Sequence, residues 1–386
     1  MTSLTAIVER AVEIRRDLHR HPELGFAEER TAAVVRRELD RLGIAWRACA
    51  GTGTVGIIGA GKTGRRIALR ADLDALPMAE ETGLPWASVH PNTMHACGHD
   101  GHTASLIAAA AYLKSREQDL PGTITLLFQP AEERGAGAQK MVDGGALDEV
   151  DEVYGYHNWP TIPLGRAGCI PGTLMAANGE FDLVITGRGG HASMPHEAID
   201  PLVAAANVVV ALQQVVSRQI NPIDPAVISV TAIQGGTAYN VIPDGVKLMG
   251  TVRGVTTALR DELGQRAQKL ATAIAEASGC RATFTYRPQY PATVNDPACA
   301  AKAAAAIERV LGAGSVNITN LPIMGAEDFA FYLQAKPGCY MLLGSAVAGK
   351  PVEPCHSPRF DYNEALIPLV MRLWADLAGV PIAAKA

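Results

Sequence analysis

The densest group of side chains that can bind a metal lies between residues 90 and 102. Four of the ten histidines fall in this stretch, and the string HACGHDGH at 95–102 adds a cysteine and an aspartate. A single glycine separates Cys97 from His99, so one extended turn can point both side chains at one centre. Thiolate and imidazole suit zinc and other borderline transition metals. A helix N-terminus capped by Asp100, with spare surface histidines, is the alternative interpretation, and the composition of the string favours metal.

Two adjacent carboxylates, Glu132 and Glu133, directly follow the apolar run TITLLFQ at 123–129 and a Pro-Ala pair. We expect that run to be a buried strand, and open α/β sheets bind their ligands at the carboxyl ends of strands. Two like charges side by side are costly unless a cation holds one of them. One carboxylate can then be a metal ligand while the other is a general base on water. An ordinary acidic helix N-terminus remains an open interpretation of this pair.

Two further histidines extend the candidate ligand set. His157 ends a short strand expected at 153–157, and His356 lies in a loop before a C-terminal helix. A single histidine of this kind is more often a structural residue than a metal ligand. Together the candidates suffice for two metal ions if the thiolate bridges them, and a two-metal centre can activate water and polarise a carbonyl. The set is Cys97, His99, Glu133, His157 and His356.

The elements that must position these residues have an α/β pattern. Apolar spacing predicts helices in the first forty residues, strands at 55–59 and 67–70, a helix at 102–114, a strand at 123–129 and a helix starting near Glu133. Alternating strands and helices indicate an α/β domain with a mainly parallel sheet flanked by helices.

The middle of the chain has a different pattern. It predicts strands at 181–187, 228–234, 247–253 and 282–286, with helices at 201–218 and 256–278. This β-α-β-β-α-β order is that of a ferredoxin-like unit. We therefore expect a discontinuous α/β domain over 1–177 and 292–386, interrupted by an inserted α+β domain over 178–291.

Composition excludes several classes of protein. The 386 residues carry a formal charge of −5, which argues against nucleic acid or an anionic membrane as partner. Apolar runs such as 202–216 are short and interrupted by Asn and Gln, so we expect no bilayer span. Seven scattered cysteines, an odd number, favour a reducing compartment, and we expect a cytoplasmic protein.

Two glycine motifs resemble nucleotide-binding loops. GIIGAGKT at 56–63 matches the P-loop pattern, but a strand-like run and not a helix follows Lys62. A hairpin turn at 59–64 is the simpler interpretation, and a P-loop NTP-binding protein is kept as a minor alternative. GTGTVG at 51–56 also lacks the helix that a dinucleotide site requires.

Five strings in order carry a family resemblance: HACGHDGH (95–102), QPAEE (129–133), YHNWP (156–160), GGHASMPH (189–196) and HSPRF (356–360). The chain resembles M20-type metallopeptidases of the amidohydrolase branch, which includes hippurate hydrolases, N-acyl-amino-acid amidohydrolases and auxin-conjugate hydrolases. The resemblance implies a catalytic α/β domain with an inserted lid that often mediates dimerisation. It also implies a dinuclear enzyme that hydrolyses the amide bond of N-acyl (acetyl or aroyl) amino acids.

The resemblance also implies a role for each matching residue. Cys97 would bridge two divalent ions, with His99 and His157 on one ion and Glu133 and His356 on the other. Glu132 would be the base that takes a proton from the bridging water, and His191 on the lid would stabilise the oxyanion, although a lid-surface histidine is its alternative. The lid residues Asn240 and Arg253 resemble substrate contacts, while a turn Asn and a solvated Arg remain open.

One string departs from the family. Many members have a His-x-Asp ligand motif where this chain has DLDALP at 72–77, so the role of Asp72 is open and Asp74 is expected to orient a ligand. The ligand types allow Zn, Mn, Co or Ni. We expect a small-molecule substrate and a homodimer or higher homo-oligomer formed through the lid. A carboxypeptidase or dipeptidase on the same centre and a structural-metal protein remain alternatives.

Overall fold

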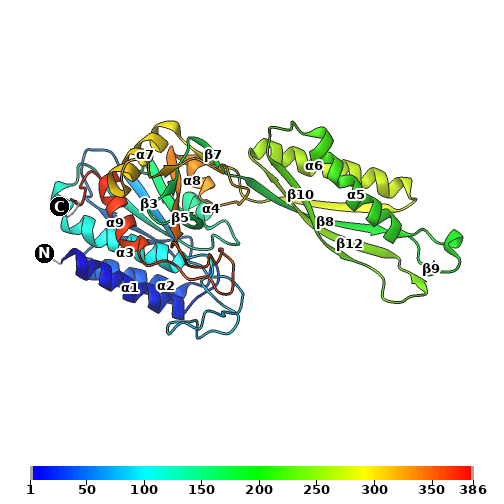
Figure 1. Cartoon of the computed structure of the whole chain (residues 1–386), viewed down its shortest axis with the longest axis horizontal. Coiled ribbons are helices and arrows are strands. Elements are labelled where there is room, and N and C mark those ends of the chain that lie inside the picture. The colour runs from blue at the N-terminus through cyan, green and yellow to red at the C-terminus, as the bar shows by residue number, and fades with distance from the viewer. Residues whose placement is uncertain (1–2, 384–386) are drawn as a thin grey trace. The chain divides into compact units, whose positions relative to one another are not determined.

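The computed structural model describes residues 3–383, which form two compact units (Figure 1). The first unit contains the described residues up to Leu174, then Val294–Leu321 and those from Asp328 onward. The second contains Met175–Thr293 and Pro322–Glu327. Each unit has its own hydrophobic core.

A mainly parallel sheet forms the centre of the first unit. Its spatial order is β1-β2-β4-β3-β5-β16-β6-β15. The four central strands, β4, β3, β5 and β16, run parallel to one another, while β1, β2 and β6 pair antiparallel with a neighbour. The strands are β1 Ala45–Cys49, β2 Gly53–Ile58, β3 Ile67–Asp72, β4 Ile124–Gln129, β5 Glu152–Pro163, β6 Ala167–Gly168, β15 Val316–Asn317 and β16 Gly338–Ala346.

Helices cover this sheet on both sides. In Figure 1, α3 and α9 lie on one side of β3 and β5, and α4 and α8 lie on the other. Helices α1 and α2 pack against α3, and α7 packs against α9 and β16. The helices are α1 Leu4–Arg20, α2 Glu29–Leu42, α3 His99–Ser115, α4 Gly137–Asp143, α7 Pro297–Leu311, α8 Ala330–Ala335 and α9 Leu366–Leu377.

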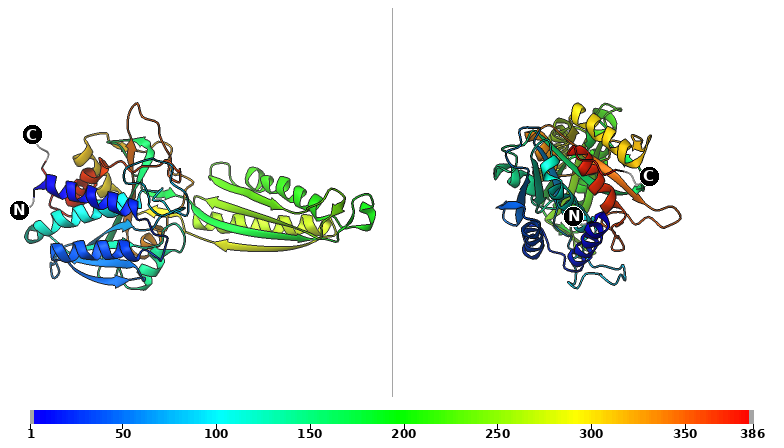
Figure 2. Two further views of the ribbon diagram at one scale, coloured as in Figure 1. Left: turned by 90° about the horizontal axis from the view of Figure 1, so that it is seen from below. Right: turned by 90° about the vertical axis from the view of Figure 1, so that its left-hand side faces the viewer.

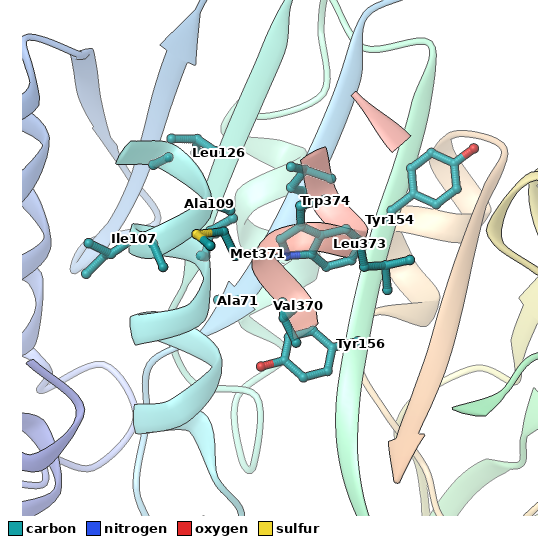
Figure 3. Close-up of a cluster of buried hydrophobic side chains, with 14 of the residues drawn as sticks. Ala71, Ile107, Ala109, Leu126, Tyr154, Tyr156, Val370, Met371, Leu373 and Trp374 are labelled. Atoms are coloured by element: carbon teal, nitrogen blue, oxygen red, sulfur yellow. The ribbon is translucent and has the colours of Figure 1, made fainter. Parts of the chain in front are cut away.

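The core of this unit joins α3, α9 and the sheet. Trp374 of α9 is fully buried, and its ring centroid lies 6.0 Å from that of Tyr156 on β5 (Figure 3). Helix α3 is buried along almost its whole length, as expected for a helix between a sheet and other helices. The helix that begins at His99 is therefore held rigidly.

The second unit is a four-stranded antiparallel sheet with two helices along one face (Figure 2). The sheet order β10-β12-β8-β13 is that of a ferredoxin-like unit. The α/β fold with an inserted α+β unit is thus confirmed. The elements are β8 Ala177–Thr186, α5 Pro201–Gln219, β10 Ala226–Gln234, β12 Gly245–Gly254, α6 Thr257–Ala277 and β13 Arg281–Pro288, with short pieces β7 Gly172–Met175, β9 Gly190–His191, β11 Val241–Ile242 and β14 Thr293–Asn295.

Three local predictions were wrong. Residues 59–64 are not a hairpin turn, because β4 lies between β2 and β3 and pairs with both. The helix expected near Glu133 begins at Gly137, so both glutamates lie in an irregular loop. Strand β5 continues to Pro163, so His157 lies within the strand and not at its end. The P-loop pattern is followed by β3 and not by a helix, so its required context is missing.

Helix α5 contains the apolar run over 202–216. Among the described residues, it is the one helix long and apolar enough to cross a membrane by length and composition alone. Core helices of globular units pass the same test, and the inner face of α5 packs on its own sheet. The side chains buried there include Ala204, Val208, Leu212 and Val215.

Candidate metal centre

The structure brings the five candidate ligands together near the carboxyl ends of β3 and β4. The ligand atoms of Cys97, His99 and Glu133 lie within 4.8 Å of one another. His157 Nε2 is 3.2 Å from Cys97 Sγ, and His356 Nε2 is 3.2 Å from Glu133 Oε1. Cys97 therefore belongs to two groups of neighbouring ligand atoms, one with His157 and one with His99 and Glu133, as a shared thiolate ligand must.

Two of the histidines are oriented as metal ligands by their other ring nitrogen. His99 Nδ1 donates to the backbone oxygen of Asp74 at 2.9 Å, and His157 Nδ1 donates to that of Asn158 at 2.6 Å. These bonds keep the Nδ1 proton in place, so in the neutral imidazole the lone pair is on Nε2, where a metal ion can accept it. His99 Nε2 is buried without a hydrogen-bond partner within residues 3–383, so the site leaves an unused ligand atom where a cation fits.

The electrostatics of the site also favour a cation. Burial lowers the pKa of His99, but the carboxylates of Asp72 and Asp74 outweigh it and raise this pKa to about 10. Hydrogen bonding to Glu133 likewise raises the pKa of His356. In the metal-free site, protons on these imidazoles balance the surplus negative charge. When metal ions bind, they replace those protons. The donor set and its charge fit divalent metal.

Cys97 and His157 complete this electrostatic picture. The neighbouring Cys355 thiol, then burial and Glu133, raise the pKa of the Cys97 thiol well above its usual value. A thiolate there therefore needs a cation. Burial, followed by His102, holds the pKa of His157 well below its usual range, so that imidazole is neutral as a ligand must be.

The loop of Glu132 and Glu133 is fixed by Asp74. Its Oδ1 accepts a hydrogen bond from the Glu132 backbone N–H at 2.9 Å, and its Oδ2 accepts one from that of Glu133 at 3.0 Å. The Glu132 side chain is only 6% exposed. Asp74 also accepts from His99 through its backbone oxygen, so one residue orients both the carboxylate loop and a candidate ligand.

Several residues around the centre have contacts that were not predicted from the sequence. Asp72, whose role was open, lies 2.7 Å from His102 Nδ1 and 2.7 Å from Arg70 Nη1. His102 Nε2 in turn lies 2.7 Å from Asn158 Oδ1. Burial opposes the charge of Asp72, but Arg70, His99 and His102 hold its pKa well below the usual range. The spacing of His99 and His102, three residues apart on a helix, was the available signal.

Cys355 is a further residue at the centre that was not among the candidates. Its Sγ lies within 4.8 Å of the ligand atoms of Cys97 and His157. Its position directly before His356 was the signal. All seven cysteines are free thiols.

The remaining predicted site residues belong to the second unit. His191 lies on β9, is exposed, and accepts hydrogen bonds at Nδ1 from the Ser193 backbone N–H and hydroxyl at 3.1 and 2.8 Å. Asn240 accepts from the backbone N–H of Ala192 through its own backbone oxygen, so its exposed amide is available. Arg253 is the second-last residue of β12, and burial lowers its pKa. Their roles stay predictions.

The comparisons with known proteins show the family of this chain. The model of Peptidase family M20/M25/M40 matches residues 68–379. IAA-amino acid hydrolase ILR1-like 4 from Arabidopsis thaliana is 42% identical, over 95% of this chain and 84% of that protein. N-acetylcysteine deacetylase from Bacillus subtilis is 41% identical over 96% of each chain. The crystal structure of the B. subtilis YXEP protein, described as a dinuclear metal-binding peptidase, has a TM-score of 0.83 and 37% identity, covering 97% of this chain and 98% of that one. The chain belongs to Peptidase family M20/M25/M40.

Proposed function

We propose that this chain hydrolyses the amide bond of N-acyl amino acids and releases a carboxylic acid and a free amino acid. The observation that carries this proposal is a buried glutamate, Glu132, which directly precedes the candidate ligand Glu133 in the chain. A structural-metal protein would leave Glu132 without a task. The similarity to an N-acetylcysteine deacetylase and an IAA-amino acid hydrolase supports the substrate class.

The ligand residues would hold two divalent ions. Cys97 would be shared by both ions, His99 and His157 would hold one, and Glu133 and His356 would hold the other. Bound there, the ions supply Lewis-acid polarisation of the acyl carbonyl and lower the pKa of water. The ligand types are compatible with Zn, Mn, Co or Ni.

Glu132 carries the proton in this mechanism. Its carboxylate takes a proton from the attacking water, whose oxygen bonds to the acyl carbon. The same carboxyl then delivers that proton to the amide nitrogen as the C–N bond breaks, so that the amine leaves neutral. Asp74 holds the Glu132 backbone while the carboxyl changes charge. His191 would donate to the developing oxyanion, and Asn240 and Arg253 would contact substrate.

The second unit is proposed as a lid that also joins two copies of the chain. Its helix α5 exposes apolar side chains on its outer face, with Val210 75% and Val203 57% exposed. Strand β10 is at the edge of the four-stranded sheet. A second copy would cover both features. The mass of the assembly in solution, for the parent and for Val210→Glu, tests this, since Val210→Glu should shift the assembly to the monomer.

Substrate comparison tests the proposed reaction. The protein is loaded separately with Zn, Mn, Co and Ni, and amine release is measured from N-acetyl amino acids, N-benzoylglycine, auxin conjugates and unblocked dipeptides. We expect hydrolysis of N-acyl amino acids with a higher kcat/KM than of dipeptides. The reverse order would make the chain a dipeptidase or carboxypeptidase on the same centre. We place the enzyme in the cytoplasm, where its seven thiols stay reduced.

A further inference from the structure

Two segments that carry cysteines lie side by side at the metal centre. The backbone N–H of His356 donates to the backbone oxygen of Ala96 at 2.7 Å. This bond pairs the residues next to Cys355 and Cys97. Cys355 Sγ lies 4.0 Å from the backbone oxygen of Cys97, and the two sulfur atoms are within 4.8 Å of each other.

The two sulfur atoms are close enough for a disulfide to form after a small movement. They lie within 4.8 Å of each other, whereas the S–S bond of a disulfide is about 2.05 Å long. Rotation of the two side chains, with a small adjustment of the loop that carries Cys355, closes this gap.

The two thiols differ in access to solvent. Cys97 is 7% exposed, whereas Cys355 is partly exposed on the loop of His356. A second close pair, Cys169 and Cys339, has its sulfurs 3.7 Å apart, but these side chains are only 3% and 0% exposed. Thiol oxidation depends on exposure, so we expect an oxidant to reach the pair with Cys355 and not the fully buried pair.

We propose that Cys97 and Cys355 form a reversible disulfide that closes the metal centre when the protein lacks metal and meets a peroxide. The disulfide takes away the thiolate that two ions would share, so the oxidised chain binds less metal. Metal bound first protects Cys97. The expected loss of metal binding rests on the proposed function. The thiol chemistry does not, because it depends only on the closeness of the two cysteine-bearing segments.

The oxidation balances with hydrogen peroxide as the oxidant. The sulfur of Cys355 attacks one peroxide oxygen, the O–O bond breaks, and one water leaves, which makes Cys355 a sulfenic acid. The sulfur of Cys97 then displaces the sulfenic oxygen as a second water, and the S–S bond forms. Peroxide accepts the two electrons, and both thiol protons end in water.

Thiol counting in the full chain tests the proposal. Metal-free protein, prepared with a chelator, and zinc-loaded protein are each treated with equimolar hydrogen peroxide and then denatured. We expect the free thiols of the metal-free protein to fall from the seven present to about five. Dithiothreitol should restore them. The zinc-loaded protein should keep its thiols, and peptide mapping should find one cross-link, Cys97 to Cys355.

Two variants sharpen the assignment. In Cys97→Ser the cross-link cannot form, so a sulfenic acid at Cys355 should persist and be trapped by dimedone. In Cys169→Ala, which removes one thiol of the buried pair, the cross-link should form as in the parent. Oxidation of Cys97 and Cys355 to separate acids, or a cross-link at Cys169, would overturn the proposal. A chain that forms the cross-link but hydrolyses no N-acyl amino acid would contradict the proposed function alone.

Discussion

Asp74 holds the backbone of Glu132 directly, because its Oδ1 accepts the Glu132 N–H at 2.9 Å. Its second oxygen accepts the next N–H, that of Glu133, at 3.0 Å. One carboxylate therefore fixes the peptide that carries both the proposed base and a proposed ligand. The loop has no helix to hold it, since α4 begins only at Gly137.

Asp74→Asn tests this arrangement. An amide group has one acceptor oxygen in place of two, so one of the two backbone N–H groups loses its partner. We expect kcat and metal affinity each to fall about 10- to 100-fold, the usual cost of removing such a supporting group. Steady-state kinetics and metal titration measure both. Asp143→Asn, at an exposed position on α4, is the control and should behave as the parent.

Cys97→Ala tests the bridging ligand. Removal of a thiolate shared by two ions should lower the metal content from two ions per chain to one or fewer. Elemental analysis of the purified variant measures this. Cys169→Ala is the control. It removes an equally buried thiol that contacts Cys339 on β16, and this variant should keep full metal content. Full metal content in Cys97→Ala would remove this residue from the centre.

Gly101→Ala tests why the metal-binding string needs its second glycine. A Cβ at this position would lie 2.4 Å from ring atoms of the fully buried Tyr362. Overpacking of this kind costs about 1–3 kcal/mol, so Tm should fall. Gly245→Ala is the control, because its Cβ would approach the nearest atom at an ordinary 3.4 Å. Equal Tm values for the two variants would contradict the account.

His19 gives the protein a pH dependence of stability. Burial lowers its pKa, but the carboxylates of Asp100 at 2.8 Å and Glu80 at 3.3 Å outweigh burial and the nearby Arg15, and raise it to about 9. Because the folded state binds this proton more tightly, the contribution is complete below pH 6.5 and is lost as pH rises through 9. The loss is on the order of 3 kcal/mol at most, at about 1.4 kcal/mol per pKa unit.

Urea unfolding at pH 6, 7.5 and 9 measures this contribution. The difference in unfolding free energy between the parent and His19→Gln should shrink as pH rises. His90→Gln, at an exposed position, should show no such trend. A constant difference for His19→Gln would mean that His19 is not charged in the folded protein.

Much of the site could be predicted because its signals are local. Residue types and order identified Cys97, His99 and the Glu132-Glu133 pair, and the apolar run before the pair predicted the strand that presents it. The insertion of β4 between β2 and β3 could not be predicted, because strand pairing is set by long-range packing and not by the turn. Cys355 directly precedes His356 in the chain, but its approach to Cys97 depends on contacts between distant segments, among them the bond from His356 to Ala96.

The central claim is that Glu132 moves the proton while other residues hold the metal. Glu132→Gln keeps the size of the side chain but removes the group that takes up the proton. The measurement is kcat on an N-acyl amino acid together with metal content in the same preparation. We expect kcat to fall by at least about 100-fold, within the range for loss of a general base, while the metal content stays at the parental level. Parental kcat at full metal content would contradict it.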